Sequence, residues 1–228
     1  MKKAIYFYLA AILLLAGCSG QAEPAASAAE NQAEQTAADT AEVAETTETA
    51  AAPAYYDGYV KNPQVVDDRL LQEVGQSMRD SKGEINLTNA NTEAQTASVG
   101  EISLTIREAK IFHFQPDYSL IDFYHSYTHD AEFDMVKFFV EIENTSDAPL
   151  HFAPVALVET SAEETKTWED DIYLEELGGE IAPGETKSGN VGFIIEKSDI
   201  DSLTVTTSDV FDKEENKLED AKKIDIKF

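Results

Sequence analysis

Two histidines four residues apart are the side chains best placed for chemistry. His125 and His129 lie in the segment HFQPDYSLIDFYHSYTHDAEFD, residues 113–134. Residues four apart share one face of a helix, so both imidazoles can bind the same divalent metal ion. Asp122 and Asp130 supply carboxylates that complete such a site. The alternative is a loop or short helix in which the histidines form only local hydrogen bonds, since two His with acidic residues nearby arise often in so acidic a chain.

The same part of the chain is rich in aromatic residues. We expect them to be buried and to cap one end of a β-sandwich, because large aromatic side chains are mostly buried. An exposed platform for a sugar or a hydrophobic peptide is the alternative. The residues are Phe112, Phe114, Tyr118, Phe123, Tyr124, Tyr127 and Phe133. We expect Trp168, the single Trp of the chain, to anchor the core.

Signatures of several common enzyme classes are missing from the sequence. It has no GxSxG, HExxH, GxxxxGK[ST] or GxGxxG motif. Cys18 is the only Cys, so no intramolecular disulfide, internal Cys nucleophile or thiolate metal site is available in the folded part. The sequence does not exclude a glycosidase that uses a pair of carboxylates, since 44 acidic residues make such pairs common and therefore uninformative. We expect no catalytic residues and no cofactor, apart from the possible metal.

The strongest strand pattern lies in residues 135–159. Val136, Phe138 and Val140 alternate with Lys137 and Glu141. This period of two predicts a half-buried strand whose charged side chains face solvent. Residues 144–149, NTSDAP, favour a turn, and the apolar run 152–158 predicts a returning strand. We interpret the two strands as the central pair of a β-sandwich.

Short strand patterns recur through the rest of the chain, with few helical ones. They cover residues 100–109, 167–174, 186–196, 203–207 and 224–228. Many short strands separated by turns are typical of an all-β sandwich rather than an α/β sheet. We therefore predict an antiparallel β-sandwich over residues 95–228. Residues 55–94 are a lead-in, either a short helix begun by Asn62 or a hairpin at DSKG, residues 80–83.

The N-terminus matches a lipoprotein signal. Residues 1–17 have a basic start and an apolar run shorter than the about 20 residues that span a bilayer. LAGC, residues 15–18, fits a bacterial lipobox, so Cys18 is the predicted lipid anchor and carries diacylglycerol. Acyl chains, palmitate among them, make such anchoring stable. An ordinary secretory signal with an unmodified Cys18 is the alternative.

Residues 18–54 are almost entirely Ala, Glu, Thr, Gln and Ser, a composition that cannot form a core. We predict a disordered linker there, between the lipid and the folded part. The chain would then lie on the extracytoplasmic face of the cell membrane.

Three pieces of sequence together resemble a known family. FFVEIENTSDAP, residues 138–149, the PGE turn at 183–185 and the strand at 100–109 follow one another as in the telokin-like, immunoglobulin-fold family of bacterial extracellular lipoproteins. The immunoprotective extracellular antigen is its best-known fold relative, and many members are domains of unknown function. The resemblance implies an immunoglobulin-like sandwich outside the cytoplasm and transfers no catalytic residue.

The formal net charge of −27 limits the partners. It disfavours nucleic acid and anionic lipid headgroups. It leaves room for a cation or for a protein of the cell envelope. We expect a lipid-anchored, non-catalytic surface module that binds or interacts with a partner. The alternative is a lipoprotein that binds a divalent metal or a small solute through residues 113–134.

Overall fold

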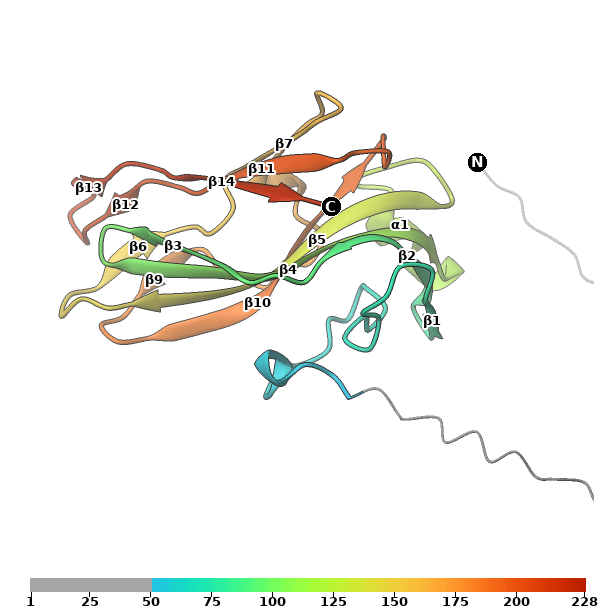
Figure 1. Cartoon of the computed structure of the whole chain (residues 1–228), viewed down its shortest axis with the longest axis horizontal. Helices are drawn as coiled ribbons and strands as arrows, with labels where there is room; N and C mark the ends of the chain where they lie inside the picture. The colour runs from blue at the N-terminus through green and yellow to red at the C-terminus, as the bar shows by residue number, and fades with distance from the viewer. Residues whose placement is uncertain (1–50) are drawn as a thin grey trace, which may run out of the picture. The chain divides into compact units, whose positions relative to one another are not determined.

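The structure, a computed structural model, describes residues 51–228. The predicted signal peptide, Cys18 and most of the predicted linker lie outside the described residues. Strands dominate the described part, and its helices are single turns (Figure 1). None of these helices has the length and apolar character that a membrane crossing requires.

One large antiparallel sheet forms the first layer of the fold. Its strand order is β1-β2-β4-β5-β10, and β3 also pairs with β4. The strands are β1 (Ser77–Asp80), β2 (Gly83–Asn91), β3 (Gln95–Val99), β4 (Ile102–Pro116), β5 (Phe133–Asn144) and β10 (Thr186–Ile195). Between β4 and β5 the chain forms η2 (Tyr118–Leu120) and α1 (Ile121–Tyr124).

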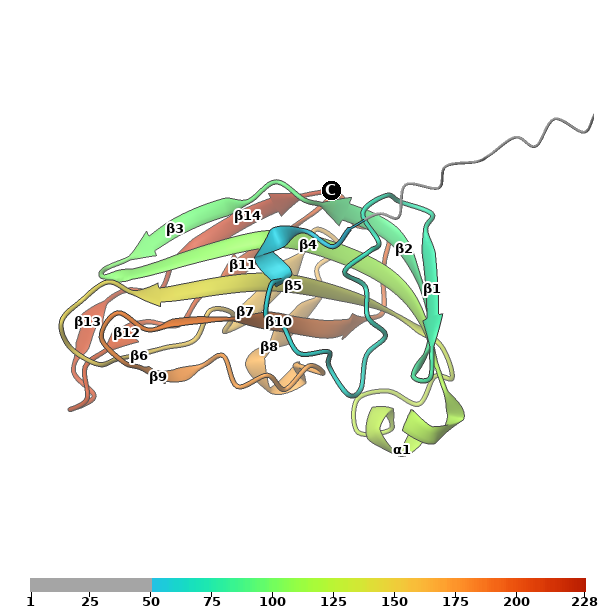
Figure 2. The same ribbon diagram turned by 90° about the horizontal axis from the view of Figure 1, so that it is seen from below.

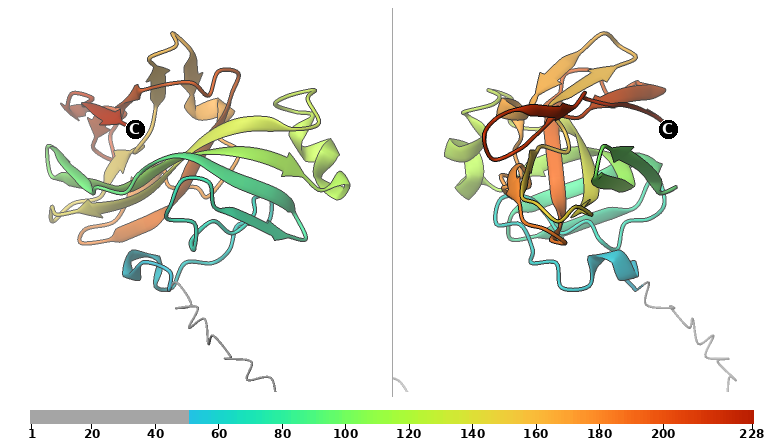
Figure 3. Two further views of the ribbon diagram at one scale, coloured as in Figure 1. Left: turned by 45° about the vertical axis from the view of Figure 1, so that its right-hand side comes forward. Right: turned by 90° about the vertical axis from the view of Figure 1, so that its left-hand side faces the viewer.

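Two smaller antiparallel sheets form the second layer. Their strand orders are β14-β11-β7-β8 and β13-β12-β6-β9. The strands are β6 (Leu150–Phe152), β7 (Leu157–Thr160), β8 (Thr165–Thr167), β9 (Gly179–Ile181), β11 (Ser202–Thr206), β12 (Val210–Phe211), β13 (Lys217–Glu219) and β14 (Lys223–Lys227). Figure 3 shows the red C-terminal strands and the blue N-terminal segment on opposite sides of the green and yellow strands of the large sheet.

The main core lies between the two layers. Alternate residues of β4 and β5 enter it, as the period-two pattern predicts. They pack against apolar residues of the small sheets, and each fully buried aliphatic or aromatic side chain contributes about 1.5–3 kcal/mol. The core includes Ile102, Leu104, Val136, Phe138, Val140, Phe152, Val158, Leu203, Val205 and Ile226. The predicted antiparallel β-sandwich is confirmed.

The predicted pairing of the strand at 136–142 with the run 152–158 is wrong. β5 pairs with β4 and β10, whereas β6 and β7 belong to the two small sheets. A turn does follow β5, and its centre is the buried side chain of Asn144. The amide of Asn144 donates to the carbonyls of Ala148 and Ile181 at 2.8 and 2.9 Å. These bonds direct the chain across the sandwich, so no hairpin forms.

The predicted hairpin at DSKG is confirmed. β1 and β2 pair in antiparallel register, with Asp80 opposite Gly83. β2 also pairs with β4, so the lead-in segment supplies two strands of the large sheet. The side chain of Asn62 accepts hydrogen bonds from the backbone N–H groups of Gln64 and Val65. The chain after Asn62 continues as turns and not as a helix.

A length of chain before β1 covers the outer face of the large sheet (Figure 2). We call residues 54–74 the N-terminal strap; it begins with η1 (Ala54–Tyr56). Its Val65, Val66 and Leu71 are buried in a second apolar cluster with residues of β2, β4 and β5, such as Leu87 and Phe112. The large sheet is therefore covered on both faces.

A β-bulge at Arg107 turns charged residues toward the strap. The register between β4 and β5 shifts between Ile106 and Glu108. One extra residue in a strand reverses the side of the sheet on which the following side chains lie. Ile106 faces the core between the layers, whereas Glu108 lies on the outer face. Lys110 follows on the outer face, opposite Lys137 of β5. Lys137 is fully buried, and the expectation that it faces solvent is wrong because the strap covers it.

Candidate functional site

A hollow of about 890 Å³ opens where the second layer divides into its two small sheets. The chain crosses from β6 to β7 there, and Ala153, Pro154 and Val155 line the hollow. Further lining residues come from η3 (Trp168–Asp170), from residues 174–179 and from β10. We call this hollow the Trp168 groove.

Trp168 and Leu174 are exposed apolar side chains that line this groove. Trp168 is 65% exposed and Leu174 is 55% exposed. The expectation that Trp168 anchors the core is wrong. The carboxylate of Asp170 accepts hydrogen bonds from the backbone N–H of Thr167 at 2.8 Å and from its hydroxyl at 3.1 Å. This capping box fixes the short turn that carries Trp168.

The carboxylate of Asp171 fixes the next part of the groove. It accepts hydrogen bonds from the backbone N–H groups of Tyr173, Leu174 and Gly192, at 2.9–3.2 Å. Burial raises the pKa of Asp171, although these N–H groups act in the opposite direction. Because Gly192 lies in β10, the bond ties the groove to the edge of the large sheet.

The carboxylate of Glu175 joins the groove segment to the N-terminal strap. It accepts hydrogen bonds from the hydroxyl of Tyr59 at 2.6 Å, the amide of Asn62 at 3.0 Å and the backbone N–H of Asn190 at 2.8 Å. Leu174 has φ +55° and Glu176, on the other side of Glu175, has φ +51°. Residues other than Gly rarely adopt this left-handed backbone conformation, so the surrounding hydrogen bonds must hold it.

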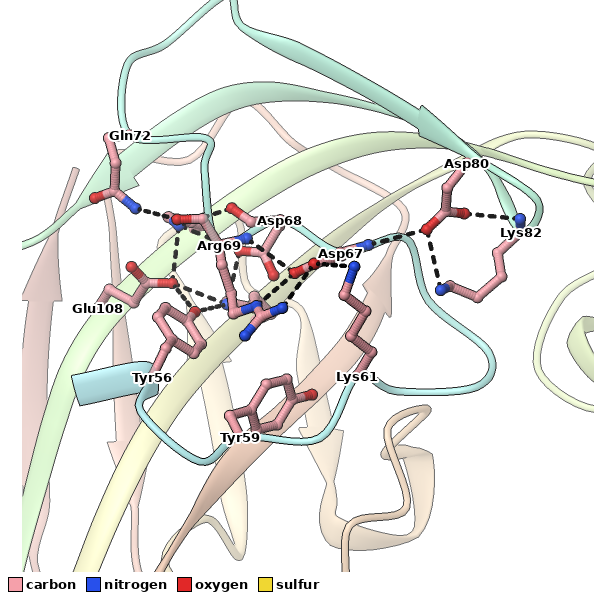
Figure 4. Close-up of polar contacts among 12 residues, drawn as sticks. Tyr56, Tyr59, Lys61, Asp67, Asp68, Arg69, Gln72, Asp80, Lys82 and Glu108 are labelled. Carbon is pink, nitrogen blue, oxygen red and sulfur yellow. Dashed lines mark hydrogen bonds and ion pairs between the residues drawn. The ribbon is translucent and has the colours of Figure 1, made fainter. Parts of the chain in front are cut away.

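Four charged side chains, one from the strap and three from β4 and β5, form a buried cluster between the strap and the large sheet. Figure 4 labels two of them, Asp68 and Glu108. Lys137 Nζ lies 2.7 Å from Asp68 Oδ2 and 2.8 Å from Glu108 Oε1. Lys110 Nζ lies 3.2 Å and 2.9 Å from the same two atoms. We call these four residues the buried ion cluster. Its two positive and two negative charges balance, as burial of charged groups requires.

Two strap tyrosines complete the cluster. The hydroxyls of Tyr55 and Tyr56 donate to the two carboxylate oxygens of Glu108 at 2.6 and 2.5 Å. Burial tends to raise the pKa of Glu108, but the ammonium groups of Lys137 and Lys110 outweigh it and hold the pKa at about 2. Burial tends to lower the pKa of Lys137, yet Asp68 and Glu108 raise it above its ordinary value. Glu108 and Lys137 therefore stay charged, and the cluster fastens the strap to the sheet.

The residues of the predicted metal site lie after and within the single turn of α1. The ring centroids of His125 and His129 are 5.9 Å apart. Both side chains are at least partly exposed, as are those of Asp122 and Asp130. Among residues 51–228, no three His, Cys, Asp or Glu side chains are grouped in a way that could hold a metal ion. The divalent-metal site stays a prediction.

Most aromatic residues of this region are buried, as expected. Phe112, Phe114, Tyr124 and Phe133 pack in the apolar cluster on the strap side of the large sheet. Tyr118 is the exception, at 83% exposed. The buried rings stabilise the end of the sandwich, whereas Tyr118 and Trp168 are exposed aromatic side chains that each line a hollow.

The sequence carries weak signals for the two features that its patterns did not predict. In TKTWEDD, residues 165–171, polar and acidic neighbours surround the Trp, whereas a core Trp usually sits in an apolar run. Each Lys of the buried ion cluster lies inside an apolar run, Lys110 in AKIF and Lys137 in VKFFV. An ionisable residue at such a position needs a buried partner of opposite charge.

Comparisons with known proteins identify relatives without an assigned function. The description "Domain of unknown function (DUF4352)" matches residues 73–217. "Uncharacterized protein YdhF" of Bacillus subtilis (strain 168) is 40% identical over 232 residues, which cover 95% of each chain.

Two solved structures resemble the fold weakly. A functionally unknown protein from Listeria monocytogenes EGD-e has 14% identity and a TM-score of 0.46, over 64% of this chain and 87% of the other. A conserved hypothetical protein from Bacillus anthracis has 12% identity and a TM-score of 0.33, over 57% and 95%. Neither likeness bears on function, and the telokin-like resemblance stays a prediction.

Proposed function

This chain belongs to the family of the domain of unknown function DUF4352, and from that premise we propose that it is a lipid-anchored, non-catalytic binding module. Its partner, a component of the cell envelope or an extracellular protein, docks in the Trp168 groove. The observation that carries the proposal is the exposure of Trp168 and Leu174 beside this groove. Exposed large apolar side chains gathered at one concave place are typical of interaction sites.

The groove is a prepared surface, which supports binding. The carboxylates of Asp171 and Glu175 hold its rim through hydrogen bonds to β10 and to the strap. A rim that is already ordered loses little conformational entropy when a partner binds. The apolar side chains of Trp168 and Leu174 thus stay exposed in the unbound protein, where this exposure adds nothing to folding stability. Their exposure favours a role in recognition.

The surroundings of the perturbed acidic and basic groups support a non-catalytic role. Active sites usually combine perturbed pKa values with an open cleft. Here Glu108 and Lys137 have perturbed pKa values, but their side chains are fully buried under the strap. Asp171 in the groove also has a perturbed pKa, but its carboxylate already accepts three backbone hydrogen bonds. The partners of Glu108 and Lys137 compensate their charges, which is the arrangement of a structural cluster.

The lipobox supports the proposed location on the extracytoplasmic face of the cell membrane. Cys18 would hold the N-terminus in the membrane, and residues 18–54 would separate the lipid from the folded part. We expect Cys18→Ala to move the full chain from the membrane fraction to the medium. A Cys18→Ala protein that still fractionates with membranes contradicts the anchor.

Photo-crosslinking in intact cells tests the binding role. A photoreactive residue placed at Leu174 in the full-length chain should give one reproducible adduct, and Trp168→Ala should remove it. The same residue at Leu218, which is 53% exposed on β13, is the matched control and should not give that adduct. Equal labelling from both positions, or an adduct unaffected by Trp168→Ala, overturns the groove as the binding surface.

A further inference from the structure

The apolar lining of the Trp168 groove suits aliphatic side chains. Pro154, Val155, Leu177 and Val191 line it together with Trp168. A sugar site needs many hydrogen-bonding groups beside its aromatic platform. Aliphatic groups bury well against such a surface, at about 25 cal/mol for each Å² of apolar area removed from water. The lining therefore favours a polypeptide over a glycan.

The charges at the groove are mostly negative. Among the described lining residues, Glu169, Asp171 and Glu176 are acidic and Lys187 is the one cation. Glu169 and Glu176 are at least partly exposed. The Nζ of Lys187 donates to the backbone carbonyl of Glu180 at 2.9 Å. A cationic partner therefore meets two accessible carboxylates, whereas an anionic partner meets repulsion.

Trp168 is a second reason to expect a cationic partner in the groove. A Lys or Arg side chain has an apolar stem that packs on an aromatic ring and a charged head that remains near water. Its head is also attracted to the face of an indole ring, by about 0.5–1 kcal/mol at an exposed site. The groove offers an indole ring, apolar walls and a carboxylate rim together.

The charge of the whole chain disfavours a second copy as the occupant. Each copy has a formal net charge of −27, so two copies repel one another. The same charge attracts a basic partner over a distance of about 8–10 Å at ordinary ionic strength.

We infer that the Trp168 groove binds a basic polypeptide segment in which Lys or Arg alternates with apolar residues. The apolar residues enter the groove, a Lys or Arg stem lies on Trp168, and its charged head meets Glu169 and Glu176. The inference rests on the proposed function, because it names the class of partner for the same groove.

The single Trp of the chain provides the assay. Trp168 fluorescence is followed while the full-length chain in detergent receives a short peptide of alternating lysine and leucine. Binding should shift the emission to shorter wavelength and protect the indole from a soluble quencher, since water is removed from its surroundings. The affinity should fall as salt is added, because salt screens the charges.

A matched pair of double variants separates the groove from the overall charge. Glu169→Gln with Glu176→Gln should weaken peptide binding at least about fivefold. Glu214→Gln with Glu215→Gln removes the same charge from the exposed turn between β12 and β13 and should leave the affinity unchanged. Equal weakening by both pairs means attraction to net charge alone and overturns the inference.

Further probes test the class of ligand. A glutamate–leucine peptide of equal length that binds as tightly, or a chitin oligosaccharide that alone shifts the emission, overturns the basic-polypeptide class. Absence of a shift with every probe overturns it as well. The crosslink from Leu174 then decides the proposed function separately: if the adduct forms, a partner of another class occupies the groove, and if it does not, both proposals fall.

Discussion

Replacing Lys137 with methionine leaves the buried ion cluster with two carboxylates and one ammonium group. The side chain of Lys137 is fully buried, 2.7 Å from Asp68 and 2.8 Å from Glu108. Methionine keeps most of the side-chain volume but cannot compensate a charge. Removing one partner of a buried ion pair costs about 3–5 kcal/mol, because the remaining charge is desolvated without compensation. We expect the free energy of unfolding to fall by about that amount.

The change in melting temperature follows from the size of the folded part. At about 2–4 °C for each kcal/mol in a domain of this size, Tm should fall by about 6–20 °C. Arg107→Gln is the matched control, because its ion pair with Glu141 is partly exposed. That change should cost about 0–1 kcal/mol. Urea unfolding followed by circular dichroism measures both free energies.

A second substitution tests whether charge imbalance causes the loss of stability in Lys137→Met. Lys137→Met with Asp68→Asn leaves only the Lys110–Glu108 pair, whose atoms lie 2.9 Å apart. The double variant should lose at least about 2 kcal/mol less than the sum of the two single variants. If the losses simply add, the four charges do not compensate one another, and charge balance is refuted as the reason for the cluster's stability.

Three further predictions concern the strap and the segment that borders the groove. The pKa of Glu108 lies at about 2, below its ordinary 4.5, so the stabilising effect of its carboxylate is complete above pH 4.5 and disappears as the pH falls toward 2. Over this range the free energy of unfolding of the wild type should fall by on the order of 3 kcal/mol more than that of Glu108→Gln, as measured by urea unfolding. Tyr59→Phe removes the hydroxyl that donates to Glu175 and should cost about 1.5–3 kcal/mol in the same assay. In Gly192→Ala the new Cβ would lie 2.6 Å from the ring of Tyr173, so Tm should fall with a loss of about 1–3 kcal/mol; an unchanged Tm would mean that the ring moves freely.

The sandwich was predictable because its core strands follow the period of two. Val136, Phe138 and Val140 all enter the core between the layers. The hairpin at Asp80 was predictable as well, since a polar turn with Gly83 separates two short strands. Both features depend on residues close together in sequence, which is where local patterns are informative.

The features that were not predicted depend on distant parts of the chain. The alternation around Lys137 is the same whether its polar face meets water or the strap, and the strap is about 70 residues away in sequence. The bulge at Arg107 reverses the side on which Glu108 lies, and no local pattern marks it. Trp168 was assigned to the core from its residue type alone, although its neighbours in the sequence are acidic.

The position of the N-terminal strap determines which part of the described structure first meets a mechanical load. A force applied from the N-terminal side reaches Tyr55 and Tyr56 before it reaches any strand, because the strap precedes β1 in the chain. Peeling the strap away would break the contacts with Glu108 and open Lys110 and Lys137 to water, while the sandwich core between the layers would keep its packing. The same event would remove Tyr59 from Glu175 and so release one support of the groove rim.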